Sequence, residues 1–231
     1  MMSTPSNDDI TVVPLRGIRG MIADKMQKSL QESAQLTHHA DCDVSVIYRR
    51  KQKYAEAGAK VSIEDVMIEA VVDTLGRHPD LNGTVIDREI HLCKAIHVSV
   101  AMALPGNLLV APAIFDAHEK SLEDLRTARQ DLAARAVTNK LTVTEMTGGT
   151  FTISNLGVSR VHHFTPILNT PQIAVLGIGC ARQQAVETEN GAVEFRSIVG
   201  LSLTFDHRAV DGAPAADFLT DLCRMIEAAD P

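Results

Sequence analysis

Several side chains that could act as acids, bases or hydrogen-bond donors stand together in the stretch FDHRAVDG, at positions 205–212. His207 follows Asp206 and precedes Asp211 by four positions. The apolar run VGLSLT comes directly before, so the histidine stands just past the end of an expected buried strand. Partial desolvation there favours the neutral imidazole that a general base requires. The same residues could instead brace a strand-to-helix turn, and the local chemistry leaves both interpretations open.

Other familiar chemical signals are incomplete in this chain. The stretch GIGCAR at 177–182 lacks the third glycine of a dinucleotide-binding turn, and Ser154 does not lie in a GxSxG motif. The pairs His38-His39 and His162-His163 are adjacent residues, whose side chains point to opposite faces of a strand. We therefore expect no metal site, and we interpret these histidines as ordinary surface or core residues rather than as lining of a channel.

The composition narrows the class of protein. The chain has 231 residues, of which 45% are apolar and only 3% aromatic, so we expect a mainly aliphatic core. Its net charge of −7, without a concentrated basic face, argues against nucleic acid, and no apolar run is long enough for a membrane span. Four widely spaced cysteines and no signal peptide favour reduced thiols in the cytoplasm.

The pattern of apolar and polar residues predicts an α/β chain in one compact domain. A first helix should bury a stripe formed by Ile18, Ile22, Met26 and Leu30. Further helices are expected from after residue 47 to about 58, over 63–75, from Ser121 to about 136, near 142–146 and after Gly212. Strands are expected over 39–47, in a hairpin at 84–92, in two strands within 95–114, and over 149–157, 172–181 and 198–207, with a hairpin turn at Asn190-Gly191.

Four longer segments together resemble the catalytic domain of the acyltransferase (E2) components of 2-oxoacid dehydrogenase complexes, which share a fold with chloramphenicol acetyltransferase. The segments are PLRGIRGMIADKMQKS, KVSIEDVMIEAVVDTLGRHPDLN, LTVTEMTGGTFTISNLGVSRVHHFTPILNTPQIAVLGIG and LSLTFDHRAVDGAPAADFL. They run in the family's order, and the last carries its DHRxxDG signature. The resemblance implies a chloramphenicol-acetyltransferase-like two-layer sandwich, a mixed sheet packed with helices, over 13–231. A flexible arm over 1–12 precedes it, and no lipoyl or subunit-binding domain is expected.

The resemblance also implies site residues. His207 matches the family's general base, and Ser154 matches the hydroxyl that donates to the oxyanion of a tetrahedral intermediate. Asp211 matches a carboxylate beside the site, for which Arg19 is the expected partner, although a purely structural ion pair is an equal alternative. Asn155 is expected to help position the substrate.

The resemblance implies that coenzyme A or acyl-CoA is a substrate, that a lipoyl group is supplied in trans, and that no metal is used. It further implies a homotrimer, with a larger cage as an open possibility. His207 of one chain and Ser154 of its neighbour would share each site. Expected partners are a lipoyl-bearing protein and the E1 and E3 enzymes of such a complex. The alternatives are a stand-alone acyltransferase with a small alcohol or amine acceptor, and a trimeric scaffold with little activity.

Overall fold

A six-stranded mixed sheet organises the chain, whose computed structural model describes residues 10–58, 60–106 and 108–228. The strand order is β1-β10-β9-β8-β4-β7; β8 runs parallel to both neighbours, and the other pairs are antiparallel. These strands are β1 (Gln35–Asp43), β4 (Val98–Val100), β7 (Ala113–Ile114), β8 (Phe151–Asn155), β9 (Ala174–Glu187) and β10 (Val193–Asp206). Two separate hairpins are formed by β2 (Gly83–Ile86) with β3 (Glu89–Leu92) and by β5 (Met102–Leu104) with β6 (Leu108–Val110).

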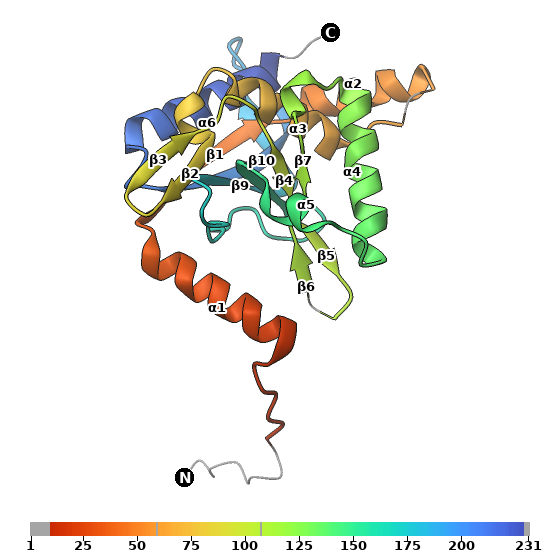
Figure 1. Ribbon diagram of the computed structural model, residues 1–231. Helices are drawn as coiled ribbons and strands as arrows, with labels where there is room; N and C mark the ends of the chain where they lie inside the picture. The colour runs from red at the N-terminus through yellow and green to blue at the C-terminus, as the bar shows by residue number, and fades with distance from the viewer. Residues whose placement is uncertain (1–9, 59, 107, 229–231) are drawn as a thin grey trace, which may run out of the picture.

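Six α-helices accompany the strands in the described part of the chain. They are α1 (Gly17–Glu32), α2 (Ser45–Glu56), α3 (Ile63–Leu75), α4 (Leu122–Val137), α5 (Val143–Thr147) and α6 (Gly212–Ala228), with short 3-10 turns at Pro79–Leu81 and Ala117–Glu119. Figure 1 shows α1 standing apart from the sheet and the other helices, with its N-terminal end directed away from them. The expected α/β sandwich with a mixed sheet is confirmed.

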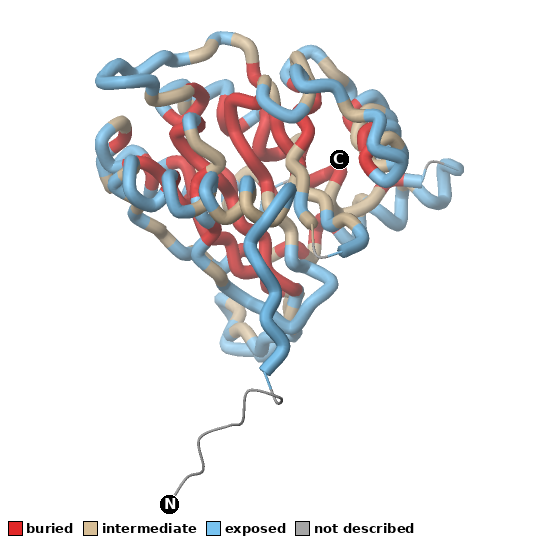
Figure 2. The backbone as a smooth tube through the Cα atoms, turned by 60° about the horizontal axis from the view of Figure 1, so that its bottom comes forward, coloured by how far each residue is buried: buried red, intermediate tan, exposed pale blue. Residues whose placement is uncertain are grey.

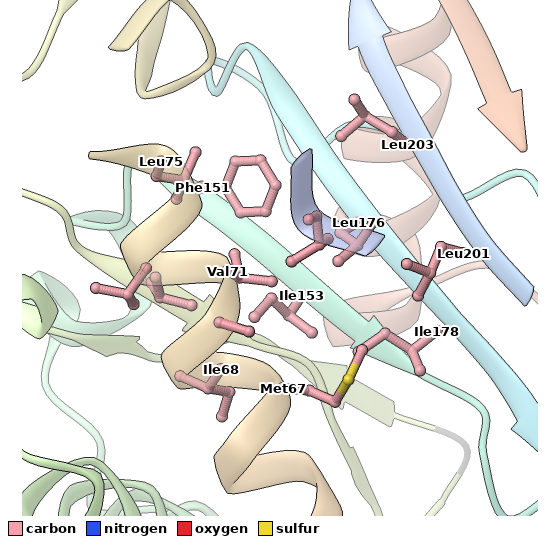
Figure 3. Close-up of a cluster of buried hydrophobic side chains, with 14 of the residues drawn as sticks. Met67, Ile68, Val71, Leu75, Phe151, Ile153, Leu176, Ile178, Leu201 and Leu203 are labelled. Atoms are coloured by element: carbon pink, nitrogen blue, oxygen red, sulfur yellow. The ribbon is translucent and has the colours of Figure 1, made fainter. Parts of the chain in front are cut away.

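The core lies between α3 and the middle of the sheet (Figure 3). Met67, Ile68, Val71 and Leu75 recur at helical spacing, so α3 turns one apolar stripe toward β8, β9 and β10. Most of α3 is buried, and the buried segments of the chain gather at the centre of the sheet while α1 is largely exposed (Figure 2). As predicted, β9 is buried on both faces from Ala174 to Cys180.

Three expectations about the elements were wrong in part. The first strand ends at Asp43 rather than Ile47, because Asp43 accepts a hydrogen bond from the Ser45 backbone and the chain turns into α2 there. The region 95–114 forms four short strands rather than two, of which β4 and β7 join the main sheet. In α1, Ile18 and Leu30 are exposed, and Ser29 is the buried residue.

A buried carboxylate ties α3 to α4. Asp65 is fully buried, accepts from the Ser62 backbone as part of a capping box, and receives a 2.7 Å hydrogen bond from Arg129 Nε. Arg129 also pairs with Glu64 at 3.0 Å. Burial alone would raise the pKa of Asp65, but the hydrogen bonds from Arg129 and Ser62 outweigh it and lower that pKa. The ionised carboxylate is therefore part of the folded structure.

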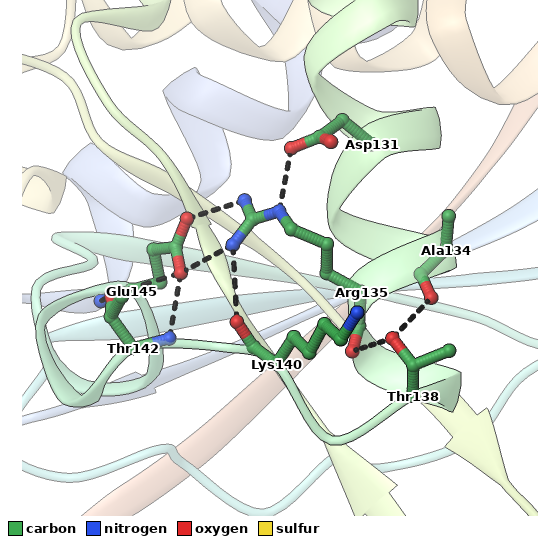
Figure 4. A network of polar contacts seen from close by, with 7 residues as sticks. All are labelled: Asp131, Ala134, Arg135, Thr138, Lys140, Thr142 and Glu145. Atoms are coloured by element: carbon green, nitrogen blue, oxygen red, sulfur yellow. Dashed lines mark hydrogen bonds and ion pairs between the residues drawn. The ribbon is translucent and has the colours of Figure 1, made fainter.

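A second arginine joins α4 to α5 nearer the surface (Figure 4). Arg135 binds Asp131 on its own helix and forms a two-pronged pair with Glu145 of the Thr142 capping box. Hydrogen bonds from Arg135, and then from the Thr142 backbone, hold the pKa of Glu145 down to about 2. This capping box begins the short helix expected near 142–146, which the structure confirms as α5.

The N-terminal arm lies mostly outside the described residues, which begin at Ile10. Residues 10–16 are exposed and belong to no helix or strand, so the boundary expected at residue 13 stays a prediction. Within the described ranges, none of the helices has the length and apolar character needed to cross a membrane.

Replacing Arg129 tests the buried pair. Arg129→Met keeps much of the side-chain length but leaves Asp65 buried without its cation, so the free energy of unfolding should fall by about 3–5 kcal/mol. Urea denaturation followed by circular dichroism measures the loss. Arg135→Met, which removes a more exposed pair, serves as the control and should cost clearly less. An Arg129→Met protein as stable as the wild type would contradict the account.

Candidate active site

The stretch DHRAVDG is held rigid by one buried carboxylate. Asp206 ends β10, is 2% exposed, and accepts hydrogen bonds from the backbone amides of Ala34 (3.2 Å) and Arg208 (3.0 Å). The Arg208 guanidinium grips the same carboxylate through Nε and Nη2. The His207 amide in turn donates to the Ala34 carbonyl oxygen at 2.8 Å. The backbone of His207 is thereby fixed between the start of β1 and the turn that leads to α6.

His207 and Asp211 come together as the sequence predicts. The imidazole Nδ1 lies 3.7 Å from Asp211 Oδ1, an ion-pair distance that is too long for a direct hydrogen bond. The ring packs against buried Phe205, with centroids 5.8 Å apart, and the His38 ring meets Phe205 edge-on. The His207 side chain is still 42% exposed, so a single chain does not supply the desolvated pocket that the sequence suggested.

Ser154 lies in a different place, in a cavity of about 400 Å³ beside α1. Its hydroxyl makes no hydrogen bond with any described residue. The cavity is mainly apolar, and its lining comes from α1, β6, β8 and the segment 164–169, with Ser154, Thr152, Lys25 and Asn169 as the polar members. Lys25 Nζ donates to Asn169 Oδ1 at 2.7 Å, and burial lowers the pKa of this lysine. An unpartnered hydroxyl in a largely apolar cavity can donate to a negative oxygen that forms there.

Strand register separates Ser154 from His207 within one chain. Ser154 and Ser202 both lie level with Gly177 of β9, so they stand two strands apart on one row. His207 lies five residues further along than Ser202. The offset is about 17 Å along the strand and about 10 Å across it. No single thioester could touch both side chains of the same chain.

The segment between β8 and β9 lies flat on the sheet because glycines face it. A Cβ on Gly179 or Gly200 would collide with the His162 carbonyl, and one on Gly177 would lie 2.8 Å from the Phe164 ring. Phe164, seated on Gly177, forms one wall of the Ser154 cavity. These close approaches explain the glycines of GIGCAR, which the sequence excluded as a dinucleotide motif.

The two supporting residues, Asn155 and Arg19, are not among those that line the Ser154 cavity. Asn155 points to the opposite face of β8, where its amide donates to Glu64 Oε1 at 3.1 Å and its oxygen accepts from the Gly157 amide. It thus tethers β8 to the first turn of α3. Arg19 lies near the start of α1. Thirteen residues, or about 20 Å of helix, separate it from Glu32, the last residue of that helix. The ion pair that Asp211 forms in this chain is with His207, so pairing of Arg19 with Asp211 stays a prediction.

His38 and His39 point to opposite faces of β1, as adjacent strand residues should, whereas His162 and His163 lie outside the strands, in the segment between β8 and β9. His38 packs on Phe205, whereas His39 hydrogen-bonds Ser202 at 2.9 Å and meets the His163 ring edge-on. Burial, followed by the neighbouring His163 and His38, lowers the pKa of His39. His162 contacts the Cys180 thiol. Across the described ranges, no three histidine, cysteine or acidic side chains are placed to hold a metal ion.

Two functional features were not apparent from the sequence. Lys25 falls on the α1 face that carries Ile22, Met26 and Ser29. A charged residue among apolar ones on that face was the sequence signal that this face lines a cavity. Asp206 had no assigned role, although its place at the end of a buried strand beside Arg208 pointed to a buried pair.

Comparison with known proteins identifies the family. The family of 2-oxoacid dehydrogenases acyltransferase (catalytic domain) matches residues 7–231. The acetyltransferase component of the acetoin cleaving system of Bacillus subtilis is 38% identical over 220 residues, covering 93% of this chain and 55% of the relative. The corresponding component of the pyruvate dehydrogenase complex of Mycobacterium bovis is 38% identical over 221 residues, covering 91% of this chain and 40% of the relative. The chain therefore spans about half the length of these relatives, or less.

Solved structures agree with the sequence comparison. A probable dihydrolipoamide acetyltransferase from Listeria monocytogenes superimposes with a TM-score of 0.89 at 30% identity, covering 96% of both chains. The dihydrolipoamide acetyltransferase of Azotobacter vinelandii gives 0.84 at 28% identity, covering 98% of this chain and 97% of that one. Chloramphenicol acetyltransferase, at 0.53 and 12% identity, shares the fold alone. The family match and the relatives at 38% identity show that the chain belongs to the 2-oxoacid dehydrogenase acyltransferase catalytic-domain family.

Proposed function

We propose that this chain transfers an acyl group between coenzyme A and the thiol of dihydrolipoamide, as the acyltransferase (E2) core of a 2-oxoacid dehydrogenase complex. The observation that carries the proposal is that a chain of this acyltransferase family has both a rigidly held His207 and an unpartnered Ser154 hydroxyl in a cavity. Both substrates are thiols or thioesters. The chemistry therefore needs a base for a thiol proton and a donor for an oxyanion.

The steps balance with these two side chains. Nδ1 of His207 faces Asp211, which leaves Nε2 to take the proton from the attacking thiol. The thiolate forms a bond to the thioester carbonyl carbon, and the carbonyl oxygen becomes an oxyanion that accepts a hydrogen bond from Ser154. When the intermediate collapses, the original carbon–sulfur bond breaks. His207 returns its proton to the departing thiolate, and no covalent bond to the protein is formed.

A complete site then requires two chains. The register keeps Ser154 and His207 of one chain about 20 Å apart. The half-exposed imidazole and the cavity beside α1 are suited to meet across an interface between copies. A homotrimer with three shared sites satisfies this constraint, because each chain gives its histidine to one neighbour and its serine to the other.

The Azotobacter vinelandii structure supports the assignment of residues. That work addresses the roles of a serine, a histidine and an asparagine in the catalytic mechanism of the enzyme. There the serine precedes the histidine by 52 positions and the asparagine follows it by four. Ser154 and Asp211 stand 53 before and four after His207. Asp211 thus takes the asparagine's position with a charge added, and we assign it to orienting the imidazole.

The remaining roles follow from position. Asn155 holds β8, and with it Ser154, to α3, and Arg19 is assigned to Asp211 across the assembled site. The lipoyl group comes from another protein or domain, and the E1 and E3 enzymes are partners of the assembled core. A larger cage and a cytoplasmic location remain predictions from the sequence.

The activity assay tests the proposal directly. Purified protein mixed with dihydrolipoamide and either acetyl-CoA or a branched acyl-CoA should transfer the acyl group to dihydrolipoamide. The release of free CoA measures this transfer. Ser154→Ala should lower kcat by about 10²–10³-fold with little change in KM, because it removes one oxyanion donor. His207→Ala should abolish turnover. Arg135→Met, outside the site, is the matched control.

Each other outcome points to a different function. Turnover only with alcohol or amine acceptors would favour a stand-alone acyltransferase. A stable trimer that turns over no acyl-CoA would favour a scaffold. Full activity in His207→Ala would refute the proposed mechanism.

Asp206 gives a prediction about stability and pH. Burial alone would raise the pKa of Asp206, but hydrogen bonds from Arg208 and Ala34 outweigh it and lower that pKa. The contribution of the ionised Asp206 carboxylate to stability is therefore complete above its pKa in the unfolded chain, about 3.9. It is lost as the pH falls through the lower pKa of the folded state. Asp206→Asn should lose about 1–3 kcal/mol of unfolding free energy at pH 7. It should also lose less further stability between pH 6 and pH 3 than the wild type does, measured by urea denaturation. Equal pH dependence in the two proteins would count against this role.

A further inference from the structure

Two cysteines far apart in the sequence meet beneath the helix that follows the DHRAVDG stretch. Cys42 lies on β1 and is fully buried, whereas Cys223 lies on α6 and is partly buried. The Cys42 sulfur is 4.0 Å from the carbonyl oxygen of Cys223, across 181 positions of sequence. The Cys42 thiol therefore lies directly against residue 223, where β1 packs on α6. Nothing in the proposed acyl transfer uses this pair.

The two thiols differ in the way that thiol–disulfide exchange requires. The hydrogen bond with Cys223, followed by burial, raises the pKa of Cys42. The hydrogen bond from Cys42 lowers the pKa of Cys223 and outweighs the burial and the nearby Glu227 and Asp41. Cys223 is therefore the thiol that more readily becomes a thiolate, and it is also the more accessible one. Cys42 is the more deeply buried member of the pair and lies against Cys223 on the core side.

We propose that Cys42 and Cys223 form a modification site at which a small organic disulfide is reduced and an intramolecular disulfide links β1 to α6. The Cys223 thiolate attacks one sulfur of the small disulfide, breaks its S–S bond and forms a mixed disulfide. The Cys42 sulfur then attacks the Cys223 sulfur, the mixed S–S bond breaks, and the proton of Cys42 passes to the departing sulfur, which leaves as a thiol. The protein loses two protons and two electrons, and the small disulfide becomes two thiols.

The other two cysteines serve as internal controls. Cys93 donates weakly to the His91 carbonyl, and Cys180 contacts His162. Both are free thiols without a cysteine partner within the described ranges. A general oxidising effect would modify them along with Cys223, whereas the paired site links Cys42 to Cys223 alone.

The experiment uses the whole protein and two probes. Reduced protein is incubated with oxidised lipoamide or oxidised glutathione, quenched with an alkylating reagent and mapped by peptide mass spectrometry. We expect a linked peptide pair containing Cys42 and Cys223, with Cys93 and Cys180 alkylated. Linkage with both probes supports a site for small disulfides in general, and linkage with lipoamide alone supports one selective for the cyclic disulfide. Alkylation of all four cysteines, or linkage of another pair, would overturn the proposal.

Two variants resolve the order of attack. In Cys42→Ser, glutathione should stay attached to Cys223, because no second thiol displaces it. In Cys223→Ser, neither linkage nor attachment at Cys42 should occur, and this partly exposed position is the milder change to the fold. Attachment to Cys42 in Cys223→Ser would overturn the assigned roles. The wild-type mapping decides the pairing itself without either variant.

Discussion

The hydrogen-bonded ladder between β9 and β10 is the constraint on which the rest of the structure depends. It places Gly177 level with Ser202, and the parallel pairing of β8 places Ser154 on that same row. The end of β10 then carries His207 well beyond the row. Because main-chain hydrogen bonds fix this register, no side-chain rotation could bring the proposed base, His207, and the proposed oxyanion donor, Ser154, of one chain together. Under the proposed mechanism, assembly of several chains, rather than folding of the single chain, completes the site.

Buried carboxylates hold in place the segments that the β9–β10 ladder does not fix. Asp206 draws together the start of β1, the end of β10 and Arg208, so the backbone of His207 has one position. Asp65 does the same for α3 and α4, and Glu64 extends that network to Asn155 beside the donor serine. Each buried acid is ionised and has an arginine partner, which is the condition under which burial of a charge is tolerated. His207 and Ser154 are thus held in place by two separate ion pairs.

Much of this arrangement could be predicted from the sequence. The helix starts near residues 63, 121 and 142 and the turn at Asn190-Gly191 depend on neighbouring residues, so local patterns located them. In the structure, capping boxes at Ser62, Ser121 and Thr142 mark those three starts. The family signature predicted His207 and Asp211 as neighbours, and the structure brings them together.

The rest depended on contacts between distant residues. The first strand ends where Asp43 turns the chain into α2. The apolar residues beyond Asp43 belong to that helix, although their spacing resembles a continuation of the strand. The exposure of Ile18 and Leu30 depends on α1 lying apart from the sheet, which no local pattern reveals. The place of Lys25 beside Ser154 depends on α1 packing over the segment 164–169, far away in sequence.

Mixed assemblies test the central claim that each site is shared between chains. Ser154→Ala and His207→Ala chains, each nearly inactive alone, are coexpressed with different tags, and assemblies carrying both tags are purified and assayed. Shared sites predict recovery of roughly a third of wild-type activity, because every trimer that contains both variants has an intact histidine facing a neighbour's intact serine at one of its three interfaces. Activity that stays at the level of the separate variants in verified mixed assemblies would contradict the account.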